Sequence, residues 1–198
     1  MRNGTEFVTA SARPSAQLRC EYRPEGRVRA VPYAWLCRHV ARRAADATGL
    51  ARPSLYAAFG DKRALYLAAL ARLHDRAERA FAGLGTLDLP LQPMVERMLL
   101  GAIDGYMSGE KGPSGCLLVG TATAESAADP EVRAALAKFL AMEDRCIEDL
   151  LVAAGSTRPA ASAALVASVI HSLSVRARAG EPRAALDRIA RDCAGMIV

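Results

Sequence analysis

Four of the polar side chains within residues 48–66, TGLARPSLYAAFGDKRALY, have types and positions that suit binding. Arg52 and Ser54 stand at the start of a short predicted helix, where such groups reach base edges or phosphates. Tyr56 offers a hydroxyl, and Lys62 begins the next helix, whose free N–H groups favour phosphate. Taken alone, Tyr56 would more simply be a core aromatic. Together the four residues predict a surface that binds nucleic acid.

Two short helices joined by a tight turn are needed to position these side chains. Apolar spacing predicts a helix over about residues 33–47, and Gly49 ends it, as glycine commonly does. Pro53 fits the first turn of the second helix. Leu55 and Phe59 are four positions apart, so both face inward. The pattern predicts a helix-turn-helix.

This stretch resembles the DNA-binding signature of the tetracycline-repressor (TetR) family. The matching residues are Gly49, Leu50, Leu55, Tyr56, Phe59, Lys62 and Leu65. The segments GCLLVGTATAES and HSLSVRARAG also resemble parts of that family's ligand-binding and dimerisation helices. The resemblance implies a dimeric repressor. Its N-terminal head would bind a double-stranded DNA operator, and its C-terminal helices would bind a small-molecule effector and dimerise.

Glycines, prolines and helix-cap residues along the chain predict an all-α protein in three parts: a poorly structured or aberrant segment over 1–30, a DNA-binding head over 31–66 and a helical body over 67–198. Asp61 and Asp129 are the expected helix caps in the body. The predicted body helices run from 62 to about 81, from 90 to 107, from 130 to 155, from 159 to about 179, and from 181 to about 196. A further helix, buried on several sides, is expected at CLLVGTATAESA.

Composition agrees with an all-α cytoplasmic protein. Apolar residues make up 52% of the 198 positions and aromatics only 5%, which favours helices over a sheet. We expect no signal peptide and no apolar run long enough to cross a membrane. The five cysteines are scattered and lack CxxC spacing, which predicts free thiols and no metal site.

Positive charge is confined to the N-terminal fifth. Residues 1–43 carry nine arginines and three glutamates, whereas residues 44–198 carry 17 basic and 18 acidic residues. Residues 31–44, VPYAWLCRHVARRA, lack the family's first-helix pattern. When they are back-translated and read one base further on, they can give FRMRGFADTSLAEL, which has it. The segment is therefore either a variant first helix or a stretch read in a shifted frame.

Eight residues are candidates for lining a ligand pocket, because methionines and aromatics adapt to irregular ligands. His171 has the simpler interpretation of a satisfied core histidine. Cys116 opens a helix, where a thiol could sense oxidants or electrophiles, although a buried inert cysteine is the commoner case. The candidates are Met94, Met98, Tyr106, Met107, Cys116, Phe139, Met142 and His171.

The last two helices carry the predicted dimer interface, whose candidates are Leu165, Val169, Leu173, Leu186 and Ile189. Paired carboxylates such as Glu143 with Asp144 have no evident acid–base partner, so the sequence predicts no catalytic residue, metal or cofactor. The rival function is an all-helical small-molecule-binding protein or enzyme that does not bind DNA.

Overall fold

The computed structural model describes residues 60–108 and 112–197, which belong to one compact unit. Every regular element in these two ranges is a helix, which confirms the all-α fold class. The helix-turn-helix and the segment before it lie outside the described residues. The elements are α3 (Lys62–Gly85), α4 (Leu91–Met107), the π-helix η1 (Leu118–Ala122), α5 (Thr123–Glu125), α6 (Pro130–Ala153), α7 (Pro159–Arg178) and α8 (Arg183–Met196).

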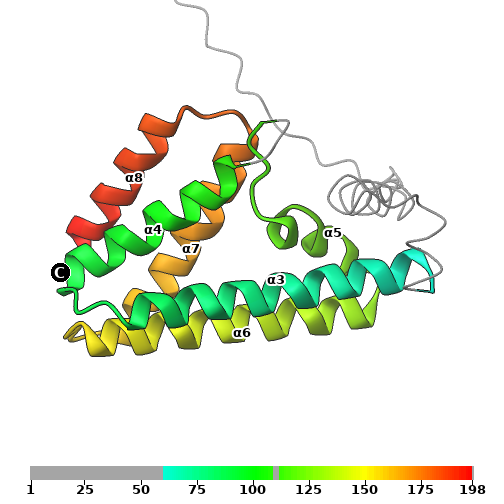
Figure 1. The fold of residues 1–198 in the computed structure, drawn as a ribbon, viewed down its shortest axis with the longest axis horizontal. Coiled ribbons are helices and arrows are strands. Elements are labelled where there is room, and N and C mark those ends of the chain that lie inside the picture. Colours follow the sequence, from blue (N-terminus) through cyan, green and yellow to red (C-terminus); the bar gives the residue numbers. More distant parts are fainter. Residues whose placement is uncertain (1–59, 109–111, 198) are drawn as a thin grey trace, which may run out of the picture. The chain divides into compact units, whose positions relative to one another are not determined.

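Two long helices, α3 and α6, lie side by side (Figure 1). Helix α7 packs against α6 and α4, and α8 packs against α4. The short η1–α5 segment lies close to α3, α6 and α7. Elements distant in sequence therefore enclose two adjoining apolar cores.

The helix caps follow the sequence prediction. The Asp61 carboxylate accepts a hydrogen bond from the Ala64 N–H at 2.8 Å. Asp129 accepts from the N–H groups of Glu131 and Val132 at 2.9 and 3.3 Å, so it satisfies two orphan donors of α6. Local side-chain chemistry thus starts both long helices.

Two helix ends differ from the prediction. Helix α3 continues through both of its glycines to Gly85, about one turn beyond the predicted end, because Leu84 packs against the core. Helix α8 begins at Arg183 and not at Glu181, since Pro182 is in an extended conformation (ψ 143°). Core packing thus extends the end of α3, and the extended backbone of Pro182 delays the start of α8.

The first core cluster joins α4, α7, α8 and the end of α6. Its fully buried side chains include Leu99, Ile103 and Leu151. The second cluster joins the start of α3 to η1 and α6, and includes Tyr66, Leu118 and Phe139. The predicted domain boundary at residue 66 therefore falls inside α3, where Tyr66 already packs with the body.

Helix α7 is long and apolar enough to cross a membrane by length and composition, contrary to our expectation that no run was. Core helices of other proteins meet the same criterion. Seven α7 residues are buried, and six of them, among them Val166, Leu173 and Ala177, belong to the first core cluster. The outward side of the same helix carries exposed Leu165 and Val175.

Candidate functional site

A partly buried ion pair joins two helices of the unit, with 29% of the His171 side chain and 4% of the Glu143 side chain exposed. Glu143 of α6 is only 3% exposed, and its Oε2 is 2.7 Å from Nε2 of His171 on α7. The hydrogen bond to Glu143 raises the pKa of His171 above its ordinary value, and the charges of Glu143 and Asp144 add to this against the effect of burial. His171 therefore has a hydrogen-bond partner within the protein.

Tyr106, near the end of α4, lies close to this pair. Its carbonyl accepts hydrogen bonds from the N–H groups of Ser114 and Gly115 at 2.8 and 3.2 Å. Burial, the neighbouring Cys116 and the charge of Glu143 all raise the pKa of its phenol. The Tyr106 side chain is thus neutral, and its hydroxyl makes no hydrogen bond to any other described residue.

Cys116 joins the same region through its backbone. Its N–H donates to Oγ of Ser174 at 2.8 Å, and Ser174 stands one turn after His171 on α7. Burial raises the pKa of the Cys116 thiol, although the backbone N–H groups of Val119 and Leu118 oppose this. The thiol is therefore held in its protonated form, which agrees with an inert cysteine better than with a sensor.

The glycine before this cysteine is required by its surroundings. Gly115 has φ +58°, and a Cβ there would lie 2.7 Å from the Ser174 carbonyl oxygen. Gly120 in η1 lies against the guanidinium of Arg178, which a Cβ would overlap. The turn from α4 into η1 is thus fitted closely to α7. Such π-helical turns are often found at functional sites.

One buried polar atom near Phe139 has no hydrogen-bond partner among the described residues. Nε2 of His74 on α3 is buried and has no hydrogen bond among the described residues. The His74 ring stands edge-on to Phe139 of α6, with ring centroids 6.3 Å apart. Phe139 and Glu143 are four positions apart on α6, so they share a face. Nothing in the sequence singled out His74.

The eight predicted pocket residues divide between the two cores. Tyr106, Cys116 and His171 come together around Glu143, as described above. A shallow hollow of about 220 Å³ lies elsewhere, at the α3–α4 turn, and only Met94 of the eight lines it. Met94 and Met98 are buried in the first core cluster, with Met107 packed against it, whereas Phe139 and Met142 are buried in the second.

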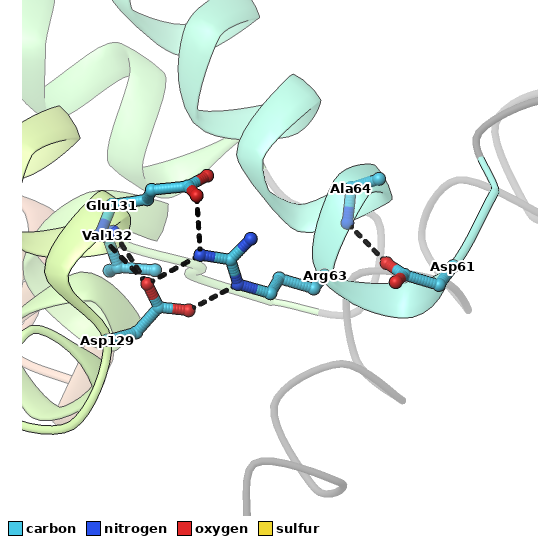
Figure 2. A network of polar contacts seen from close by, with 6 residues as sticks. All are labelled: Asp61, Arg63, Ala64, Asp129, Glu131 and Val132. Carbon is cyan, nitrogen blue, oxygen red and sulfur yellow. Dashed lines mark hydrogen bonds and ion pairs between the residues drawn. The ribbon is translucent and has the colours of Figure 1, made fainter.

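A polar network fixes the start of α3 to the start of α6 (Figure 2). Nε of Arg63 is 2.7 Å from Oδ2 of Asp129, and Nη2 is 2.9 Å from Oδ1. Nη2 is also 3.1 Å from Oε1 of Glu131. The Arg63 hydrogen bonds lower the pKa of Asp129 to about 2, helped by the Glu131 and Val132 N–H groups. One carboxylate thus caps α6 and binds α3.

A buried hydroxyl pair makes a second connection one turn along α3. The Tyr66 hydroxyl and Oγ1 of Thr121 in η1 are 2.8 Å apart, and Thr121 also donates to the Leu117 carbonyl at 2.6 Å. The first turn of α3 is therefore bonded both to η1 and to the start of α6. Sequence reasoning missed both connections, because their partners are 55 and 66 positions apart.

Of the four predicted nucleic-acid contacts, only Lys62 falls within the described residues. Lys62 is the first residue of α3, but its side chain lies outside the description. Arg52, Ser54 and Tyr56 lie outside it altogether.

The predicted dimer residues need a correction. Leu173 and Leu186 are both 0% exposed, so their side chains face the protomer's own core and cannot form an outer surface. Val169 and Ile189 are partly buried against the same core. Of the five, only Leu165 is well exposed, at 60%. The helical period placed the leucines on a buried face, which the spacing alone could not distinguish from an interface.

No protein-family model and no curated protein matches the sequence. Solved structures do match. A double cysteine mutant of CifR, a TetR family transcriptional regulator complexed with 26-bp double-strand operator DNA, is 25% identical over 76% of this chain and 82% of that one, with a TM-score of 0.62. The chain has the TetR fold.

Two further TetR structures agree. A triple cysteine mutant of CifR on the same type of DNA is 23% identical, covers 87% of this chain and all of that one, and has a TM-score of 0.65. A TetR-family protein from Rhodococcus sp. is 23% identical over 83% of this chain and 90% of that one, with a TM-score of 0.55. The TetR fold predicted from the signature is therefore confirmed.

Proposed function

We propose that this chain is a ligand-responsive DNA-binding transcriptional regulator, a repressor that acts as a cytoplasmic homodimer. The observation that carries the proposal is the likeness of its fold to a TetR regulator complexed with operator DNA. The signature around Tyr56 supports it independently of the fold. In the described residues no group of three or more His, Cys, Asp or Glu side chains could hold a metal.

DNA binding is tested by fluorescence anisotropy of the chain with duplexes from the DNA that flanks its coding sequence. Tyr56→Phe and Lys62→Ala should weaken binding to all duplexes, and Lys62→Ala should lower the salt slope by about one. Arg52→Ala and Ser54→Ala should instead change which duplex is preferred. Equal effects of all four substitutions on every duplex would contradict these roles.

Dimerisation is assigned to the outward face of α7. Leu165 and Val175 are 60% and 57% exposed there, and the exposed Ser168 and Ser172 between them are small enough for a partner helix to approach closely. Exposed apolar residues in a row along one helix mark an interaction surface. Met196 of α8 is also exposed, at 78%.

Sedimentation at micromolar concentration tests this interface. Leu165→Glu and Val175→Glu should convert the dimer to monomer, because each places a charge at a two-fold apolar contact. Val152→Glu is the matched control: Val152 is 58% exposed but stands on α6. A monomeric wild type, or equal effects of all three substitutions, would contradict the assignment.

For repression to respond to a ligand, binding of the ligand to the helical body must alter the spacing of the two recognition helices, which the dimer holds about one DNA turn apart. An effector that binds more tightly to a dimer with another spacing lowers the DNA affinity. The size of this decrease is set by the ratio of the effector's affinities for the two spacings. Lys62 follows the signature residue Phe59 by three positions. The bonds from Arg63 and Tyr66 to Asp129 and Thr121 are therefore the route by which movement in η1 or α6 would reach the head.

A rival function is a small-molecule-binding protein or enzyme without DNA binding. The observation that favours it is the departure of residues 31–44 from the family's first-helix pattern. A comparison of the present chain with a variant carrying FRMRGFADTSLAEL and the in-frame sequence upstream of it decides between them. DNA affinity that rises in the variant supports the regulator, and absence of DNA binding by both supports the rival.

A further inference from the structure

The segment η1 is a single π turn within an otherwise α-helical stretch. At its start the Gly120 N–H donates to the Cys116 carbonyl at 3.0 Å, and at its end the Ser126 N–H donates to the Ala122 carbonyl at 2.9 Å. Both of these bonds span four positions, as in an α-helix. The backbone angles on both borders of η1 are also α-helical. Because a π turn spans five positions, η1 holds one extra residue between two α-helical flanks.

Two threonine hydroxyls favour the π turn over the α-helix. Oγ1 of Thr121 donates to the Leu117 carbonyl at 2.6 Å, and Oγ1 of Thr123 donates to the Val119 carbonyl at 3.0 Å. Each carbonyl lies four positions back, where in an α-helix it would accept the backbone N–H of the same threonine. The hydroxyls therefore compete with the backbone bonds that an α-helical η1 would form.

The position of the π turn also determines which side chain of η1 meets α3. The hydrogen of the Thr121 hydroxyl points to Leu117, so Tyr66 is the donor in the 2.8 Å bond between the two hydroxyls. Both residues are buried, with Tyr66 1% and Thr121 4% exposed. The neighbours of Thr121 are Gly120 and Ala122, which have no hydroxyl. A shift of the turn by one residue, in either direction, therefore breaks this connection to α3.

One side chain stands in the way of such a shift. Gly120 lies against the guanidinium of Arg178, and a shift by one residue would bring the side chain of Val119 or Thr121 to that place. Arg178 is exposed and forms no hydrogen bond or ion pair with another described residue. Its guanidinium is the end of a long flexible side chain, so it can move aside.

We propose that η1 is a switch with two registers: the π turn moves by one residue, Thr121 leaves Tyr66, and the buried connection between η1 and α3 opens. Backbone bonds broken on one side of the turn re-form on the other, so the hydroxyl bonds of Thr121 are the main difference between the two registers. The consequence for DNA binding rests on the proposed function, because α3 follows the head directly. The switch itself belongs to the helical body and is measured without DNA.

Relaxation-dispersion NMR of the full chain, labelled at its alanine methyl groups, tests the proposal. Ala122 is 0% exposed at the end of the turn, so its methyl group should exchange between two environments on the microsecond-to-millisecond timescale. Ala163 of α7, 2% exposed, is the control and should give a flat profile. A flat profile at Ala122, or the same exchange at Ala163, would overturn the proposal.

Thr121→Val keeps the shape of the side chain and removes both of its hydroxyl bonds. It should raise the population of the second register about fivefold, which is the usual size of one hydrogen bond. Thr123→Val removes a hydroxyl bond within the same segment but none to α3, so its effect should be smaller. Equal effects of the two substitutions on exchange at Ala122 would overturn the proposal.

Deletion of Val119 removes the extra residue and should leave a continuous α-helix without exchange at Ala122. Exchange that persists in the deletion variant would overturn the proposal. If this variant does not fold, the comparison of the two threonine substitutions decides alone. A chain that binds the flanking DNA but gives a flat profile at Ala122 refutes this inference and leaves the proposed function standing. Exchange at Ala122 without DNA binding does the reverse.

Discussion

The two polar clusters of the helical body differ in burial and in consequence. The Glu143–His171 pair is the more buried, with side chains 4% and 29% exposed, whereas those of Asp129 and Arg63 in the α3–α6 network are 13% and 38% exposed. Water screens the outer pair and competes for its donors, so such pairs add little stability. Removing one partner of a buried pair leaves an uncompensated charge, which is costly. The inner cluster thus bears on stability, and the outer one on how helices are connected.

The largest stability effect is expected for His171→Ala. This change leaves the Glu143 carboxylate buried without its partner, which we expect to lower the free energy of unfolding by about 3 kcal/mol. Urea denaturation at neutral pH measures it. Because the double variant His171→Ala/Glu143→Ala removes the orphaned charge, it should be more stable than His171→Ala alone. A double variant that is less stable would show that the pair is not coupled in this way.

Gly115→Ala should come next, with a loss of about 2 kcal/mol. The left-handed backbone and the close Ser174 carbonyl both oppose a Cβ at this position, where the chain turns toward the inner cluster. Gly101→Ala is the matched control in α4, where a Cβ meets nothing within 4 Å. It should be neutral or stabilising by up to about 1 kcal/mol, since alanine favours helix. Equal losses for the two variants would contradict the close fit of the turn.

The two clusters should respond to pH in opposite directions. The pKa of His171 is raised, so its contribution is fully present below its unfolded pKa near 6.5 and is lost as pH rises through the folded value. The pKa of Asp129 is lowered to about 2, so its contribution is present above 3.8 and is lost as pH falls toward 2.

Urea midpoints of the wild type, His171→Gln and Asp129→Asn across this range test the contrast. The loss of stability in His171→Gln should shrink as pH rises above about 6.5, and the loss in Asp129→Asn should shrink as pH falls from about 4 to about 2. The charged groups that act on His171 are Glu143 and Asp144 of α6. Tyr106 and Cys116 stay uncharged in both pH ranges, because the pKa of each is raised. Parallel pH profiles of the two variants would remove the distinction between the clusters.

Arg63→Ala should have the smallest effect on stability, because Arg63 is solvent-exposed and Asp129 still caps α6. If the α3–α6 network carries the signal to the head, the same change should weaken the effect of bound ligand on DNA affinity. Anisotropy titrations with and without ligand measure this coupling. Arg133→Ala, which removes hydrogen bonds to the Ser126 and Ala127 carbonyls but none to α3, is the control. Unchanged coupling in Arg63→Ala would exclude the network as the route.

Much of the fold was predictable because its signals are local. Asp61 and Asp129 cap helices by bonding N–H groups within three residues, and Gly155 and Gly180 stop helices through positive φ. The helical spacing correctly placed Leu173 and Leu186 on the apolar faces of their helices. The prediction that these side chains form the dimer interface was wrong, because both are buried in the protomer's own core. A helix of this kind has apolar residues on both its inner and outer faces, and spacing does not say which face meets the core.

The sequence by itself determined the helices, their caps and the signature that identifies the TetR fold, since each rests on neighbouring residues or on a short fixed spacing. Only the tertiary structure decided that Glu143, dismissed beside Asp144, pairs with His171 across 28 positions, and that Arg63 reaches Asp129 across 66. It also placed the neutral Cys116 thiol beside Tyr106. These contacts depend on which helix faces pack together, and that is settled by burial summed over the whole chain and not by the residues next to any one of them.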